Sequence, residues 1–178
     1  MAIRPLLYYP QDEALLRQKS TPIKKVDDSI QELVTDLKET LLTHPGAGLA
    51  APQIGVHKRV VVVRLGQDKG EAEPPRALIN PVILEEGPLA KGFDGCLSLP
   101  KISTWDTMRP SWLRFRAQDE RGKTFEMRVE GIDSILVHHE IDHLDGVLFM
   151  DRLIDGAKLY LSVDTEDGEK LVPIGQLP

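Results

Sequence analysis

One five-residue stretch constrains this chain more than any other: HEIDH at residues 139–143, inside an apolar run typical of a helix. Residues four apart on an α-helix lie about 40° from each other around its axis, so His139 and His143 face the same way. Two imidazoles one turn apart can bind one divalent metal ion, and Glu140 is then placed beside that ion as a general base. The alternative is a helix with two ordinary histidines, and the rest of the chain has to decide.

The flanking residues predict that this stretch lies on a central helix. Ile132, Ile135 and Leu136 share a stripe with both histidines, and Asp-Gly at 145–146 is a typical helix end. An earlier amphipathic helix is expected over residues 29–44, with a capping box of Ser29 and Glu32 at its start.

Strand patterns occupy much of the remaining chain. Residues 59–65 are a β-branched run typical of a buried strand, and residues 112–117 and 124–129 alternate as an antiparallel hairpin. Further expectations are an extended arm at 1–10, a charged loop at 66–75, a strand at 76–84 broken at Pro81, a turn at 85–92, a strand-like piece at 93–100, an extended segment at 147–153, and a tail hairpin of 158–163 with 170–174. Because the strand pairs look antiparallel, the expected class is α+β, with antiparallel or mixed sheets packed around the central helix that carries HExxH.

Length and composition favour one domain. The chain has 178 residues, with no internal repeat and no linker that divides it. Its net charge of −6 argues against general binding of nucleic acid through phosphate neutralisation. No apolar run approaches the ~20 residues that a membrane helix needs. Residues 1–5 lack the charged-then-apolar order of a secretory signal, which favours a cytoplasmic protein.

The metal site would need a third protein ligand beside an open position. No histidine follows His143, and the carboxylates downstream of it resemble solvated loop residues: Asp151, Asp155, Asp164, Glu166 and Glu169. Upstream lies Cys96, the single cysteine, in an apolar strand-like setting. A thiolate with two imidazoles suits Zn(II) or Fe(II). The alternatives are a carboxylate as third ligand, and Cys96 as a small buried apolar residue.

Three segments together resemble a known family. GAGLAAPQ at 46–53, DGCLS at 94–98 and HEIDHLDG at 139–146 resemble, in this order, the three signature motifs of the peptide deformylase family. Residues 9–10 and 16–17 resemble its N-terminal arm, so that the resemblance covers residues 5–154. The tail, residues 156–178, lies outside it and has no expected role.

The resemblance implies a metal-dependent hydrolase that removes the N-formyl group from N-terminal formylmethionine and releases formate. It implies one divalent ion, usually Fe(II), which Zn(II), Ni(II) or Co(II) can replace. The implied metal ligands are Cys96, His139 and His143. Metal-bound hydroxide would be the nucleophile, and Glu140 the general base and acid.

The resemblance also assigns residues around the substrate. Gln53 and the backbone N–H of Leu97 would hold the developing oxyanion, and one such donor is commonly worth ~3 kcal/mol in the transition state. Gly48 and Gly95 would flank a groove in which the substrate backbone pairs like an added strand. Two residues one turn before His139 are expected to line an apolar pocket for the methionine side chain, with plain core packing as the alternative: Ile135 and Leu136.

The implied partners are N-formylmethionyl peptides of nascent chains, met during transient association with the ribosome, and neither DNA nor a membrane. Residues 1–178 would form a single catalytic domain in the cytoplasm. Two competing hypotheses keep the same motif: a metallopeptidase with an acidic third ligand, and a peptide-binding module without turnover.

Two residues depart from the family pattern. Asp94 stands where the family usually has Glu, and we expect it to pair with Arg109 as a structural prop beside the site. His138 stands where Gln is frequent. It lies about 100° around the helix from His139, which places it outside the ligand set.

Overall fold

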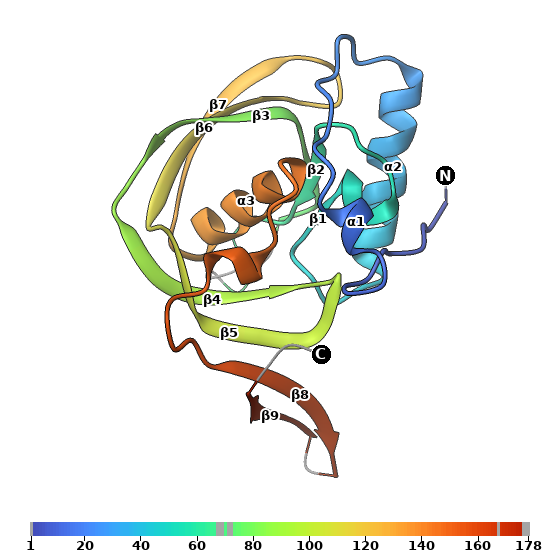
Figure 1. Cartoon of the computed structure of the whole chain (residues 1–178). Coiled ribbons are helices and arrows are strands. Elements are labelled where there is room, and N and C mark those ends of the chain that lie inside the picture. Colours follow the sequence, from blue (N-terminus) through green and yellow to red (C-terminus); the bar gives the residue numbers. More distant parts are fainter. Residues whose placement is uncertain (1, 67–69, 71–72, 167, 176–178) are drawn as a thin grey trace.

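The computed structural model describes residues 2–66, 70, 73–166 and 168–175, and its strands form two antiparallel sheets around one helix (Figure 1). The helical elements are α1 (Glu13–Leu16), α2 (Asp28–Leu42), η1 (Ala51–Ile54), α3 (Gly131–Leu144) and η3 (Phe149–Arg152). The strands are β1 (Gly48–Ala50), β2 (Val60–Val63), β3 (Arg76–Glu86), β4 (Leu89–Cys96), β5 (Leu99–Pro110), β6 (Trp112–Gln118), β7 (Thr124–Glu130), β8 (Leu159–Thr165) and β9 (Gly168–Ile174).

Helix α3, which carries HEIDH, lies between the two sheets. One sheet has the strand order β1-β2-β3-β6-β7 and the other β4-β5-β8-β9. Figure 1 shows α3 enclosed by them, and it contacts strands of both. The predicted α+β class with a central helix is therefore confirmed. Within the described ranges, no helix is long and apolar enough to cross a membrane.

Strand β2 consists of four consecutive valines, and both of its faces are buried. Val60 and Val62 pack into the core cluster formed with α2, whereas Val61 and Val63 pack into the cluster formed with α3. A strand covered on both faces needs apolar residues without alternation, as this run provides. Strand β2 is thus buried on both faces, and α3 packs against one of them.

The N-terminal arm ties together two segments that later prove to carry the site. Leu7 N–H donates to the carbonyl of Gln53 at 2.8 Å, and Tyr9 N–H donates to the carbonyl of Ser98 at 2.9 Å. Residues 2–8 of the predicted arm form neither helix nor strand, residues 9–10 lie in a turn, and Met1 lies outside the described residues.

Several boundary predictions were right. The hairpin β6–β7, helix α3 and the tail hairpin β8–β9 all form where their patterns placed them. Parts of the predicted loop at 66–75, and Asp167 in the tail hairpin, fall outside the described residues. Helix α2 forms too, but its cap is Asp27, whose side chain accepts a hydrogen bond from Ile30 N–H; the predicted Ser29–Glu32 capping box was wrong.

Three other predictions were wrong for local reasons. Strand β3 continues through Pro81, because its register with β6 shifts between Ile79 and Val82 and this bulge accommodates a residue without an N–H. The predicted turn at 85–92 is confined to residues 87–88, because β3 extends to Glu86 and β4 begins at Leu89. Strand β5 was not predicted. The segment 147–153 holds η3 because the Asp151 carboxylate accepts from Leu148 N–H and folds the chain back.

Helix α3 ends against the N-terminal part of the chain. Gly146 follows the helix with a φ of +72°, and a Cβ there would lie closer than 3.0 Å to the carbonyl group of Arg17. Ser20 N–H also donates to the carbonyl of Leu144 at 2.8 Å. The close approach fixes the end of the helix, and only glycine permits it.

Gly146→Ala is therefore expected to lower the free energy of unfolding by about 3 kcal/mol or more, since it adds a backbone clash to left-handed strain. Gly156→Ala is the matched control, because Gly156 has a φ of +73° and open space around it. It should cost about 1 kcal/mol. Urea denaturation followed by circular dichroism measures both, and equal losses would show that the contact with Arg17 is unimportant.

Candidate metal centre

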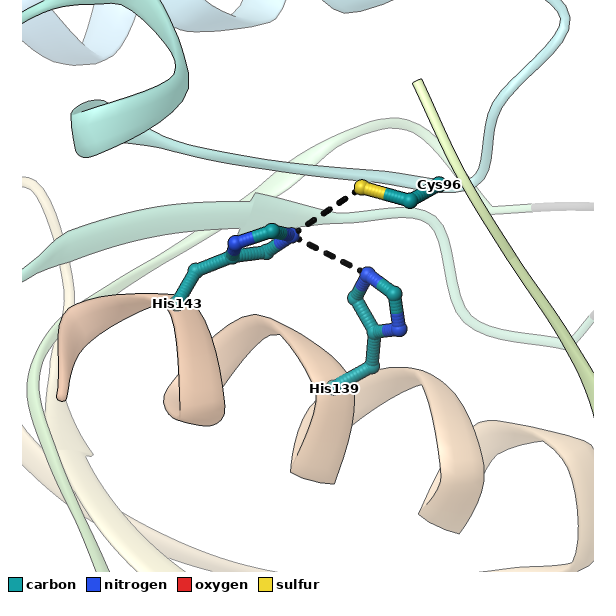
Figure 2. Close-up of side chains that lie close together, drawn as sticks. All are labelled: Cys96, His139 and His143. Carbon is teal, nitrogen blue, oxygen red and sulfur yellow. Dashed lines mark hydrogen bonds between the residues drawn. The ribbon is translucent and has the colours of Figure 1, made fainter. Parts of the chain in front are cut away.

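Three donor atoms converge beside α3. His139 Nε2 lies 3.1 Å from His143 Nε2, and His143 Nε2 lies 3.3 Å from Cys96 Sγ (Figure 2). All three atoms lie within 4.8 Å of one another. The helix supplies both imidazoles, one turn apart, and the end of β4 supplies the thiol. The predicted set of Cys96, His139 and His143 is thus brought together in space.

The spacing of these atoms suits a tetrahedral ion. Zinc bonds of about 2.05 Å to nitrogen and 2.3 Å to sulfur would separate two nitrogens by about 3.3 Å, and a nitrogen from the sulfur by about 3.6 Å. The measured separations of 3.1 Å and 3.3 Å are close to these values. The donors therefore fit a divalent ion of the Zn(II) or Fe(II) kind.

Asp94 orients the first imidazole. Its Oδ1 accepts a hydrogen bond from His139 Nδ1 at 2.7 Å, which turns Nε2 of the ring toward the cluster. Such an outer carboxylate is the usual partner of a histidine that binds metal. The other oxygen of Asp94 accepts from Arg109 Nε at 2.5 Å, as expected from the sequence.

Arg109 is the centre of a buried polar cluster. It is 1% exposed, and its Nη1 donates to Asp142 Oδ2 at 2.8 Å and to His138 Nδ1 at 2.7 Å. Asp142 in turn accepts two bonds from Arg152. His138, expected outside the ligand set, points into this cluster. Burial lowers the pKa of His138 to about 4, so it is neutral and accepts the bond from Arg109.

The charges of the centre are shifted by burial and by one another. Burial acts to raise the pKa of the Cys96 thiol, but the charge of His143 and hydrogen bonds from both imidazoles bring it down to about 5. Burial raises the pKa of Glu140 to about 7, against the opposing effect of the two histidines. Within the described part of the chain, Glu140 Oε2 and His143 Nδ1 are buried without a hydrogen-bond partner.

Gln53 reaches the same point from η1. Its Oε1 accepts from Ala50 N–H at 2.8 Å, which fixes which way the amide points. Its Nε2 then faces Ser98 Oγ at 3.1 Å and Cys96 Sγ at 3.5 Å. The amide donor is thus directed at the candidate metal centre, and Ser98, which sequence reasoning did not single out, helps to hold it.

A cavity of about 690 Å³ opens onto this centre. All the predicted site residues line it except His143, which is buried behind the cavity wall: Gly48, Gln53, Gly95, Cys96, Leu97, Ile135, Leu136, His139 and Glu140. Sequence reasoning missed part of the wall, namely Trp105 on β5 with Ser162 and Leu171 on the tail hairpin; Glu169, considered there only as a third metal ligand, lines the cavity as well. The tail residues carried no motif, so only the pairing of β8 with β5 reveals them.

Comparison with known proteins agrees with the motifs. The family model described as Polypeptide deformylase matches residues 3–158. The chain is 45% identical over 153 residues to a peptide deformylase of Alkalilimnicola ehrlichii, covering 86% of this chain and 83% of the relative. It is 42% identical to one of Cellvibrio japonicus, covering 86% and 88%. A crystal structure of a peptide deformylase from Legionella pneumophila matches with a TM-score of 0.75 and 38% identity, covering 86% of this chain and 87% of the other.

The cluster around Arg109 gives a prediction. Arg109→Ala leaves the buried carboxylate of Asp94 without its guanidinium partner and leaves Asp142 with Arg152 alone, so the free energy of unfolding should fall by about 3–5 kcal/mol, and less zinc should be retained after dialysis. Arg114→Ala is the matched control, because Arg114 also pairs with two carboxylates, Glu85 and Glu126, but at the surface. It should cost less than about 1 kcal/mol. Similar losses in urea denaturation, with equal zinc contents, would remove the role of Arg109.

Proposed function

The chain belongs to the peptide deformylase family, and from this we propose that it removes the formyl group from N-formylmethionyl peptides of nascent chains with one bound divalent metal ion. The observation that carries the proposal is the convergence of Cys96 Sγ, His139 Nε2 and His143 Nε2 beside Glu140 in one cavity. We further propose that it acts in the cytoplasm as a single catalytic domain, residues 1–178, with transient association with the ribosome.

The residues proposed to hold the ion are Cys96, His139 and His143. Their thiolate and imidazole donors suit Fe(II), which we propose as the usual metal, and also Zn(II), Ni(II) or Co(II). Support comes from the donor spacing and from Asp94, which directs Nε2 of His139 inward. When bound, such an ion acts as a Lewis acid that lowers the pKa of water and polarises a carbonyl group.

Glu140 carries the proton in this proposal. Its carboxylate lies in the cavity wall one residue after His139, where it accepts a proton from the attacking water. The water oxygen bonds to the formyl carbon, and the C–N bond then breaks. Glu140 passes the proton to the leaving amine, so that formate and a free N-terminal methionine result.

Two donors are proposed for the oxygen that becomes negative during the attack. The amide of Gln53 already points at the centre, because Ala50 N–H holds its other end. The backbone N–H of Leu97, in the turn between β4 and β5, is the second. Preorganised donors of this kind act in the transition state without reorganisation, and each is commonly worth ~3 kcal/mol.

The substrate-binding roles follow from the cavity wall. Gly48 and Gly95 border the cavity from β1 and β4, and a Cβ at Gly95 would lie 3.3 Å from the carbonyl of Ile102. Bare backbone there permits a peptide to pair as an added strand. Ile135 and Leu136, half-buried on α3, are proposed to line the pocket for the methionine side chain.

The metallopeptidase alternative finds less support. In the described ranges, the group of side chains able to hold a metal is the Cys–His–His set alone. Two of the downstream carboxylates considered for that role pair elsewhere: Asp151 with Arg17, and Asp164 with Lys101.

Substitutions at the centre test the function. Glu140→Ala should retain its metal but release formate from a formyl-methionyl peptide about 10²–10⁴-fold more slowly, since the proton carrier is gone. Cys96→Ala should lose both metal and activity. Metal analysis and a formate assay on anaerobically purified protein measure these outcomes. Full activity of Glu140→Ala would refute the mechanism, and a metal-loaded, active Cys96→Ala would favour the metallopeptidase.

A glycine gives an independent test of the position of Glu140. A Cβ at Gly48 would lie closer than 3.0 Å to the Glu140 carboxyl group, whereas one at Gly46 would meet the movable side chain of Leu97. Gly48→Ala should therefore displace the carboxylate and lower kcat by about 100-fold in a fold that survives. Gly46→Ala should lower kcat much less. Equal kinetics of the two variants would mean that the place of Glu140 is not critical.

A further inference from the structure

The tail hairpin β8–β9 extends the walls of the candidate site. The family match ends at residue 158, and β8 begins at Leu159. Strand β8 pairs with β5, with Ser103 opposite Tyr160, so the hairpin continues the sheet that holds Cys96. Ser162, Glu169 and Leu171 line the same cavity as the metal centre.

Strand register shows which face of the hairpin meets the cavity. Ser162 is opposite Leu171, and Leu161 is opposite Val172. Leu161 packs against the core cluster of Ile102 and Phe149, so its neighbour Ser162 faces the other way. Because side chains alternate along a strand, Leu171 lies on the cavity face and Val172 on the opposite one. Their exposures are nearly equal, at 39% and 38%.

The cavity face of this sheet is unusually apolar for an accessible surface. Phe93, Trp105 and Ile132 line the cavity beside Leu171, and they are 44%, 46% and 40% exposed. The ring of Trp105 packs edge-on against Phe93 at 5.1 Å and against Tyr160 at 5.3 Å, between ring centroids. Large apolar side chains gathered in one accessible hollow mark a surface that binds apolar groups.

The hairpin is held in place before any ligand arrives. Thr104 Oγ1 donates to the carbonyl of Lys158 at 2.7 Å, and Lys101 pairs with Asp164 at 2.8 Å. The Ser162 hydroxyl donates to the Glu169 carboxylate. Lys101 and Glu169 both line the cavity, so their opposite charges leave no strong preference for a charged ligand.

Distance separates this surface from the reacting group. In the order β4-β5-β8-β9, Leu171 lies three strands from Cys96. At a spacing of about 4.8 Å, three strands span about 14 Å. This is several times the ~3.5 Å that one extended residue spans, so Leu171 lies beyond the first residue of a bound substrate.

We propose that the β8–β9 hairpin is a specificity element, whose Leu171, with Trp105, contacts apolar side chains of the formyl-peptide that follow its N-terminal methionine. The proposal rests on the proposed function, since it places the formyl group at the metal centre. It assigns a role to the tail, which the motifs leave without one.

The test compares two peptides of equal length, formyl-Met-Ala-Leu-Phe and formyl-Met-Ala-Gly-Gly, on the metal-loaded full chain. The wild type should prefer the apolar peptide by about tenfold in kcat/KM, mainly through KM. Leu171→Glu should abolish this preference, because it places a charge against the apolar side chains. Val172→Glu, on the opposite face of the same strand, should retain it.

Equal preference in Leu171→Glu and the wild type would overturn the proposal, as would the same loss in Val172→Glu. If Leu171→Glu does not fold, Leu171→Ala against Val172→Ala decides, with a loss of about threefold expected only in the first. Absence of formate release from both peptides by the wild type would refute the proposed function itself. Release with no preference between the peptides would refute the specificity element alone.

Discussion

The buried guanidinium of Arg109 is the constraint on which the site depends. A fully buried charge is tolerated only when it is paired and hydrogen-bonded, so its partners must come to it. Asp94 comes from β4 and Asp142 from α3, while Arg109 itself lies on β5. One side chain thus fixes the place of the helix relative to the β4–β5 hairpin. Asp94 in turn holds His139 through the hydrogen bond to its Nδ1. This bond fixes where Nε2 of His139 lies relative to the other two donor atoms.

The candidate metal centre concentrates features that cost stability. Glu140 Oε2 and His143 Nδ1 are buried, and no side chain or backbone group in the described ranges satisfies them. Two imidazole nitrogens stand 3.1 Å apart, where their lone pairs repel unless a proton or an ion lies between them. An ion that binds only the folded chain would offset these costs, so metal affinity and fold stability are linked here.

Sequence patterns predicted the elements that local residue order determines and missed those that depend on tertiary contacts. Helix α3 and the β6–β7 hairpin follow from the period of their own residues, and so they were predicted. Strand β5 was missed because its polar residues are buried by partners far along the chain, as at Thr104 and Arg109. The placement of Cys96 beside His143 is tertiary, and spacing along the chain left it open; only the family resemblance assigned it.

The tail hairpin shows where such a resemblance stops. Motifs mark the residues that the chemistry requires, and here they end before β8. A cavity wall, however, is built by whichever strand completes a sheet, and sheet edges accept further strands through backbone bonds that carry no sequence signature. Because β5 offers such an edge to β8, residues without a motif line the same cavity as Glu140. The end of the family pattern therefore does not coincide with the end of the cavity wall.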